Sequence, residues 1–224
     1  MLTVDIHTHR PSSGAVTLRT AGIHPWRAGE YGIDGACALR EVLGPALDNA
    51  QAIGETGLDY ACTAPREAQE RLFRAHLGLA AGMQLPVVVH CVRAFEPVMK
   101  ILGQYPLRAV VFHGFIGSVQ QALRAVQRGY WLSFGVRSMR SARTAEAMRA
   151  IPAECLFIET DDDPTPLGEV CEAAAALLGT DPETLAAQLY ANYKRLTVSP
   201  DLPICGIKSS LFQREDLGGN VSMK

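Results

Sequence analysis

The amino-acid sequence predicts an α/β protein built as a TIM-like (β/α) barrel, either seven-stranded or distorted. Short apolar runs alternate with segments of helical periodicity, a pattern typical of a parallel sheet with helices outside it. The runs are continuously apolar, as strands buried on both faces are. At 224 residues the chain fits one domain, because α/β barrels commonly have this size. An open doubly wound sheet is the alternative, but no glycine-rich phosphate loop follows the first run.

Seven strands are expected, near residues 2–7, 18–24, 50–55, 86–90, 108–113, 130–134 and 155–160. The first strand is followed by Pro11-Ser12-Ser13-Gly14, turn residues that break an extended segment. The second strand ends at His24, because Pro25 holds the residue before it in an extended conformation and cannot continue a central strand.

Helices are expected near 35–49, 65–83, 94–104, 118–128, 142–150, 167–178 and 181–195. The second is the clearest, because apolar residues recur at helical spacing from Leu72 to Met83. Ser118 can cap the fourth helix, and Gly129 stands just past its end. Pro45 weakens the second half of the first helix.

Near residue 197 the sequence changes character. Prolines and glycines become frequent and helical periodicity is lost. We therefore expect one barrel domain at 1–197, followed by a C-terminal tail at 198–224.

Composition limits the possible partners and location. The net charge of −2 gives no strong field toward DNA or membranes, so any nucleic-acid contact must be local. No apolar run is long enough to cross a bilayer, and Asp5 and His7 interrupt the first apolar stretch, unlike a signal peptide. Six scattered cysteines without a CxxC pair suit reduced thiols. We expect a cytoplasmic monomer that does not bind membranes.

The stretch Val4-Asp5-Ile6-His7-Thr8-His9 is the first candidate site. Alternate strand residues point to the same face, so Asp5, His7 and His9 are expected in line. Neutral imidazole binds Zn, Mn, Fe and similar ions, whereas two imidazoles at a strand end fill a core poorly. The alternative is a pair of solvated histidines, and the rest of the chain must decide between them.

Polar residues also end the later strands. In a parallel barrel all carboxyl ends of the strands open on one face, where active sites lie. We expect the side chains at these ends to converge, and their mixture of imidazole and carboxylate suits a transition-metal site. They are His7, His9, His24, Glu55, His90, His113 and Asp161. The sixth histidine, His76, lies on a predicted helix and needs no functional role.

These pieces resemble the TatD family of metal-dependent hydrolases, within the amidohydrolase-like barrels. The resemblance covers roughly residues 1–197, and the order and spacing of the pieces make it specific. The matching pieces are Asp5-Ile6-His7-Thr8-His9, Gly22-Ile23-His24-Pro25, Ile53-Gly54-Glu55-Thr56-Gly57-Leu58-Asp59, Val88-Val89-His90-Cys91, Phe112-His113-Gly114-Phe115 and Glu159-Thr160-Asp161, together with Gln69, Phe73 and Asn192.

The resemblance implies a centre of two divalent metal ions, such as Zn, Mg or Mn. It implies that His7 and His9 hold one ion, that His90 and His113 hold the other, and that Glu55 bridges both. Asp161 would be a further ligand beside the nucleophilic water and would accept its proton. Two ions can clamp the attacking and leaving oxygens of a phosphodiester displacement, and family members include nucleases acting on DNA.

Two positions are expected to contact the substrate. His24 could touch a phosphate oxygen or the leaving group, as a catalytic and binding residue. Arg93 is the nearest match to an arginine that the family often has two residues after the His90 position. The expected substrate is DNA or a small phosphodiester.

The sequence also departs from the family pattern. Only 14 residues separate His9 from His24, so one βα unit is expected to be lost and the barrel shortened. The usual HCFSGS and ETDAP motifs are altered, and Asp162-Asp163 adds negative charge near the site. Three alternatives to a nuclease therefore stay open: a C–N hydrolase such as a deacylase, a PHP-type phosphoesterase, and a noncatalytic metal-binding barrel.

Overall fold

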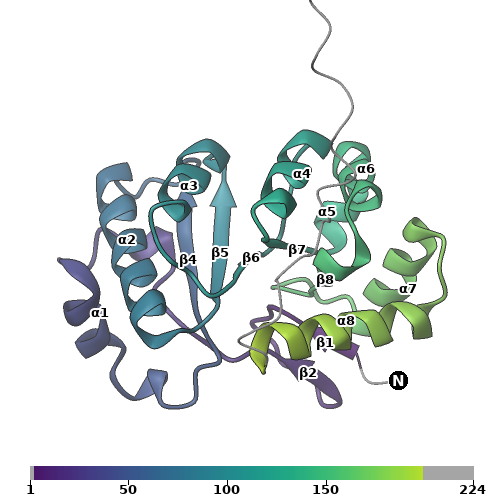
Figure 1. Cartoon of the computed structure of the whole chain (residues 1–224), viewed down its shortest axis with the longest axis horizontal. Helices are drawn as coiled ribbons and strands as arrows, with labels where there is room; N and C mark the ends of the chain where they lie inside the picture. Colours follow the sequence, from purple (N-terminus) through teal and green to yellow (C-terminus); the bar gives the residue numbers. More distant parts are fainter. Residues whose placement is uncertain (1–2, 199–224) are drawn as a thin grey trace, which may run out of the picture.

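The structure is a computed structural model that describes residues 3–198 (Figure 1). Its strands are all paired in parallel, which confirms the predicted α/β class. β3 to β8 form one sheet in chain order, and β1 pairs with β2. The strands are β1 (Thr3–Asp5), β2 (Ala15–Thr17), β3 (Thr20–Ala21), β4 (Ala52–Asp59), β5 (Val87–Val92), β6 (Val110–Phe112), β7 (Trp131–Phe134) and β8 (Leu156–Ile158).

Backbone contacts bring the first and last strands side by side. The N–H of Ile6 donates to the carbonyl of Ile158 at 3.2 Å, and a parallel bridge joins Thr8 to Asp161. β2 and β3 are separated by only two residues, so segment 15–21 pairs with β1 at its start and with β4 at its end. The sheet therefore curves until its first and last strands lie side by side. Closure into a ring of seven hydrogen-bonded strands stays a prediction.

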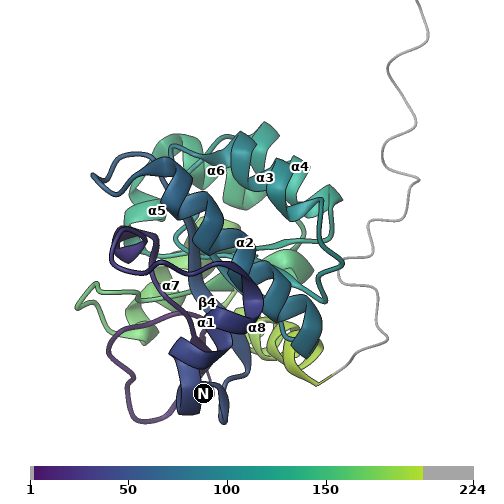
Figure 2. The same cartoon turned by 90° about the vertical axis from the view of Figure 1, so that its left-hand side faces the viewer.

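Helices cover the outside of the curved sheet, as Figures 1 and 2 show. α1 and α2 pack against each other, α2 packs on β4, and α8 packs on β1. The helices are α1 (Gly35–Leu43), α2 (Arg66–Met83), α3 (Phe95–Leu102), α4 (Val119–Gln127), α5 (Val136–Arg140), α6 (Ala142–Ala150), α7 (Leu167–Leu178) and α8 (Pro182–Thr197), with 3-10 turns η1 (Pro25–Arg27), η2 (Gly44–Leu47) and η3 (Ala153–Cys155).

Several predicted boundaries were wrong. The helix expected at 35–49 ends at Leu43, because Gly44 has a φ of 47° and Pro45 cannot continue the hydrogen bonding. Within the strand expected at 18–24 only Thr20–Ala21 (β3) is a strand, and β2 lies before it at Ala15–Thr17. β4 continues past Glu55 to Asp59, so Glu55 lies inside a strand rather than at its end. The short helix α5 was not predicted.

β1 and β2 are joined without a helix. Parallel neighbours are usually connected by a crossover of a dozen or more residues containing a helix, but here the connection is 6–14 and contains no helix. This agrees with the predicted loss of a βα unit. Because no helix of its own covers it, Ala15–Thr17 is only half-buried, in contrast to the fully buried β1.

The interior is packed with aromatic and branched side chains. The largest buried rings are those of Trp131, Phe73, Phe112, Phe134 and Phe157. Cys37, Cys62, Cys91 and Cys171 are free thiols, whereas Cys155 is disulfide-bonded, so the expectation of reduced thiols at all six cysteines was wrong. No helix among residues 3–198 is long and apolar enough to cross a bilayer. The predicted tail, 198–224, lies outside the described residues apart from Val198.

Candidate metal centre

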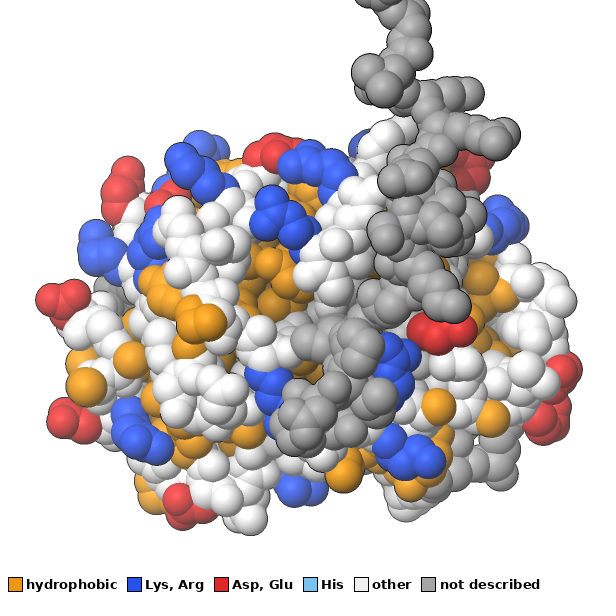
Figure 3. Space-filling model, in the orientation of Figure 1, with side chains coloured by type: hydrophobic (Ala, Val, Ile, Leu, Met, Phe, Trp, Pro, Cys, Tyr) orange, Lys and Arg blue, Asp and Glu red, His pale blue; other side chains and the backbone are white. Residues whose placement is uncertain are grey.

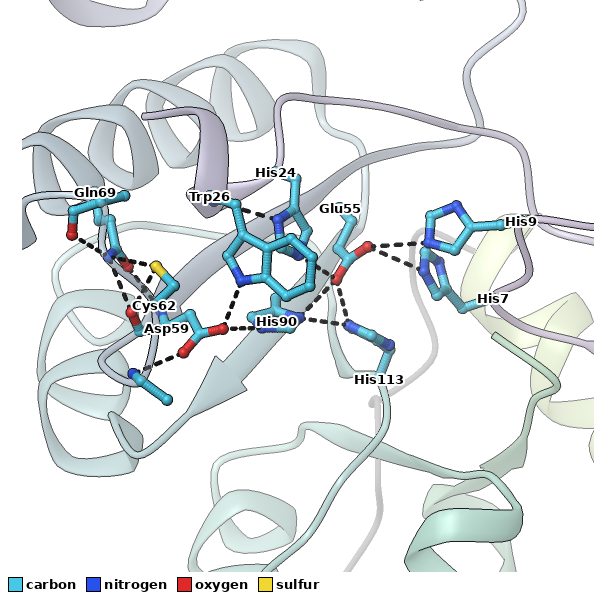
Figure 4. A network of polar contacts seen from close by, with 12 residues as sticks. His7, His9, His24, Trp26, Glu55, Asp59, Cys62, Gln69, His90 and His113 are labelled. Carbon is cyan, nitrogen blue, oxygen red and sulfur yellow. Dashed lines mark hydrogen bonds and ion pairs between the residues drawn. The ribbon is translucent and has the colours of Figure 1, made fainter. Parts of the chain in front are cut away.

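The predicted site residues come from strands that end on one face of the sheet. His7 and His9 follow β1, His90 lies in β5, and His113 follows β6 directly. Figure 4 shows these imidazoles turned toward a single carboxylate, that of Glu55 on the neighbouring strand β4. The parallel order explains this convergence, because the carboxyl ends of neighbouring strands share one edge.

One oxygen of Glu55 faces three imidazoles. Its Oε1 lies 2.6 Å from Nε2 of His113, 2.7 Å from Nδ1 of His90 and 3.2 Å from Nε2 of His24. The side chain of Glu55 is only 7% exposed. This oxygen is therefore enclosed by nitrogen atoms and has little access to water.

The other oxygen of Glu55 faces the histidines that follow β1. Its Oε2 lies 3.2 Å from Nε2 of His7 and 3.7 Å from Nε2 of His9. Oδ1 of Asp161 is 3.7 and 3.5 Å from the same two nitrogens. His7 is buried, whereas the His9 side chain is 59% exposed, so this half of the cluster opens to solvent.

Burial and charge shift the pKa values in the cluster. Burial alone would raise the pKa of Glu55, but close contacts with the imidazoles of His113, His24, His7 and His90 outweigh it and hold that pKa far below its usual range. Burial alone would lower the pKa of His113, but the carboxylates of Glu159 and Glu55 raise it well above its usual value.

The pKa of Asp161 is raised, chiefly by burial. The neighbouring charge of Glu159 raises it further, while His113 and His7 oppose the shift.

The cluster fits divalent metal ions. Four sets of three side chains have ligand atoms within 4.8 Å of one another: His7–Glu55–His113, His7–His9–Asp161, His24–Glu55–His90 and His113–Glu159–Asp161. Buried Nε2 of His7, Nδ1 of His113 and Oε2 of Glu159 have no hydrogen-bond partner in the described structure. Such atoms are costly unless an ion or water satisfies them, and imidazole with carboxylate is a donor set for Zn, Mn and Fe.

Sequence reasoning missed two carboxylates. Glu159 is buried, and its Oε1 lies 3.4 Å from Nδ1 of His113, so it can orient that imidazole. Its position two residues before Asp161, directly after an apolar run, was the available signal. Asp59 lies 3.4 Å from Nε2 of His90 and accepts a 2.6 Å hydrogen bond from Nε1 of Trp26.

The structure separates two expected residues from the cluster. Asp5 accepts hydrogen bonds from the N–H and hydroxyl of Thr160 at 3.0 and 2.7 Å, so it braces the segment before Asp161. Among the described residues no hydrogen bond or ion pair joins Arg93 to the histidines. Arg93 instead lines a cavity of about 610 Å³ that reaches His113 and also contains Arg143.

His76 holds the segment that carries His24. Its Nε2 accepts a hydrogen bond from the N–H of Ile23 at 2.9 Å, so Nδ1 carries the proton and donates to the carbonyl of Leu72 at 2.8 Å. Both nitrogens are satisfied, in agreement with the structural role expected from the sequence. Burial lowers the pKa of His76 to about 4, so the ring is neutral near pH 7.

A curved parallel sheet with imidazoles and carboxylates at its carboxyl edge defines the class of amidohydrolase-like proteins. Within that class the chain belongs to the TatD related DNase family, whose family model matches residues 8–197. This match decides between the two resemblances considered, in favour of TatD over PHP-type phosphoesterases.

Curated relatives and solved structures agree. The chain is 32% identical over 200 residues to a Citrobacter rodentium protein named 3'-5' ssDNA/RNA exonuclease TatD, covering 79% of this chain and 75% of that protein. An Erwinia amylovora protein of the same name is 33% identical over 202 residues, covering 79% and 76%.

Two solved structures show the same fold. The TatD homologue YJJV of Escherichia coli K12 superposes with a TM-score of 0.71 and 25% identity over 89% of this chain and 86% of that one. A TatD family hydrolase of Entamoeba histolytica gives a TM-score of 0.70 at 18% identity, covering 88% and 84%.

Proposed function

We propose that this chain is a TatD-type phosphodiesterase that hydrolyses the ends of single-stranded nucleic acid, or small phosphodiesters, with two divalent metal ions. The observation that carries the proposal is that the two carboxylate oxygens of Glu55 face different pairs of histidines. One of its oxygens faces His7 and His9, and the other faces His90 and His113. A carboxylate placed in this way is suited to bridge two ions.

The proposed ligands fall into two groups around that carboxylate. His7, His9 and Asp161 would hold one ion, and His90 and His113 would hold the other. Two divalent ions held by these residues would supply positive charge to the attacking and leaving oxygens of the phosphodiester and would lower the pKa of bound water. The metals could be Zn, Mg, Mn or similar ions.

The remaining chemistry falls to the side chains. Asp161, whose Oδ1 lies 3.7 and 3.5 Å from Nε2 of His7 and His9, would accept the proton of the attacking water. His24, with Nδ1 already accepting from the N–H of Trp26, presents Nε2 to the centre and would contact a phosphate oxygen or the leaving group. Arg93, in the adjoining cavity, would contact a phosphate further along the strand.

The substrate must be recognised through local contacts. The net charge is −2, and Figure 3 shows Lys and Arg side chains scattered among acidic and apolar ones on the face in view. With a net charge of −2, the chain would gain little from counterion release on long duplex DNA. The names of the relatives point to single strands and 3' ends, which we adopt for this chain.

The proposed catalytic unit is residues 1–197, acting as a monomer in the cytoplasm. Every proposed ligand lies between His7 and Asp161, so none belongs to the predicted tail.

The test is a set of hydrolysis assays on protein stripped of metal and then supplied with Zn²⁺, Mn²⁺ or Mg²⁺. We expect release of mononucleotides from a single-stranded oligonucleotide in the presence of metal and no release in its absence. Acylated amino acids assayed in parallel examine the C–N hydrolase alternative. Amide hydrolysis without phosphodiester hydrolysis would replace our proposal with that alternative. Bound metal with neither activity would indicate a noncatalytic barrel.

A further inference from the structure

We propose that the indole of Trp26 is a stacking platform for one nucleobase of the strand whose phosphate lies at the metal centre. This proposal rests on the phosphodiesterase function proposed above, and it names the part of the substrate that the metal ligands do not contact. Its basis is a tryptophan ring that is exposed, rigidly held and adjacent to the cluster.

Trp26 lies beside the metal ligands. It belongs to the 3-10 turn η1, two residues after His24. Its ring centroid is 4.6 Å from that of His24 and 6.4 Å from that of His90, with planes nearly perpendicular. Figure 4 shows the indole between His24 and Asp59. A nucleotide with its phosphate among these histidines therefore carries its base within reach of this ring.

The ring is held in one orientation. Nε1 donates to Oδ2 of Asp59 at 2.6 Å, and the backbone N–H donates to Nδ1 of His24 at 3.2 Å. Asp59 is itself fixed, because its Oδ1 accepts from the N–H of Ala61 and the buried amide of Gln69 bonds its backbone. A ring fixed in this way loses little further conformational freedom when a ligand binds to it.

The same ring is largely in water. Trp26 is 62% exposed, whereas Trp131, the other tryptophan of the chain, is 1% exposed. A nucleobase stacked on the indole removes apolar surface from water and needs no opposite charge, which suits a chain with a net charge of −2. Bases inside a duplex are already stacked on their neighbours, so this platform selects an unpaired end.

Kinetics of three variants test the platform. Trp26→Ala should raise KM for a single-stranded oligonucleotide about 5- to 150-fold, the range of a lost base–aromatic stack, with kcat within a few-fold. Trp26→Phe keeps an aromatic face, so its KM should stay within a few-fold of the native value even though it cannot donate to Asp59. Val42→Ala, at an exposed apolar position on α1, is the matched control and should change neither constant.

An oligonucleotide whose terminal nucleotides lack their bases supplies the second comparison. The native protein and Trp26→Ala should have similar KM values for it, because no base remains to stack. If Trp26→Phe is as impaired as Trp26→Ala, or if the abasic strand shows the same difference, the ring acts by supporting Asp59 and His90, and the platform is refuted.

Fluorescence separates this proposal from the proposed function. In the Asp161→Asn background with divalent metal, a single-stranded oligonucleotide should quench the emission of Trp26, and the abasic strand should not. Adding Trp26→Phe leaves only buried Trp131 and should remove the quenching. Quenching without hydrolysis by the native protein would retain the platform and refute the phosphodiesterase. Hydrolysis by the native protein, with no quenching and with an unchanged KM in Trp26→Ala, would retain the phosphodiesterase and refute the platform.

Discussion

The two central carboxylates should have separable roles, which a pair of amide substitutions can reveal. Glu55 is contacted on both oxygens by imidazoles, whereas the ion-pair contacts of Asp161 in the cluster are with His7 and His9. Glu55→Gln removes the negative charge shared by both proposed ions, so we expect metal content and activity to fall together. Asp161→Asn keeps the shape and one ligating oxygen but removes the base, so most metal should remain.

The magnitude follows from the chemistry assigned to Asp161. Loss of a positioned general base typically costs about 10²-fold or more in kcat, and we expect at least this loss in Asp161→Asn. Metal stoichiometry and steady-state kinetics on the same preparations provide the assay. Asp162→Asn is the matched control, because Asp162 is the adjacent carboxylate, pairs with Arg137 at 3.3 Å and belongs to none of the four ligand sets. Turnover by Asp161→Asn within a few-fold of the native rate, with metal bound, would refute the assignment of the base.

Three further outcomes are expected. Chelation should abolish hydrolysis, and up to two equivalents of a divalent ion should restore it; undiminished turnover by metal-free protein would contradict the metal centre. Glu159→Gln should weaken metal binding about 10- to 100-fold, the usual effect of removing a partner that orients a ligand, as measured by competition with a chelator; unchanged affinity would show that Glu159 does not support His113. The pKa of His76 is about 4 in the folded chain and about 6.5 in an unfolded one, so below pH 6.5 only the unfolded chain takes up this proton. The free energy of unfolding should therefore fall by about 3 kcal/mol between pH 6.5 and 4 from this residue, and His76→Gln should remove that part of the slope in denaturant titrations.

The strand ends were predictable because their signal is local. A valine-rich run that closes on a histidine, as at His90 and His113, fixes both the strand and the face on which the side chain lies. Glu55 was placed at a strand end but lies within β4. The misplacement did not affect the predicted cluster, because its side chain still faces the neighbouring histidines.

Contacts between distant parts of the chain could not be predicted from local patterns. Asp5 shares the strand alternation of His7 and His9, yet Thr160, 155 residues later, engages both of its oxygens. Glu159 looked like an ordinary part of a motif until the structure placed it beside His113. Arg93 was chosen by analogy of position. It has a φ of 52° at the turn into α3 and lines the adjoining cavity, so its contact with substrate stays a prediction.

The pairing of Thr8 with Asp161 has a consequence for biosynthesis. The first strand leaves the ribosome long before the segment that completes its hydrogen bonding, which follows 153 residues later. At typical elongation rates of about 5–20 residues per second, His7 and His9 wait roughly 8 to 30 seconds for Asp161. A nascent chain therefore cannot assemble the complete cluster of histidines and carboxylates until residue 161 has been synthesised.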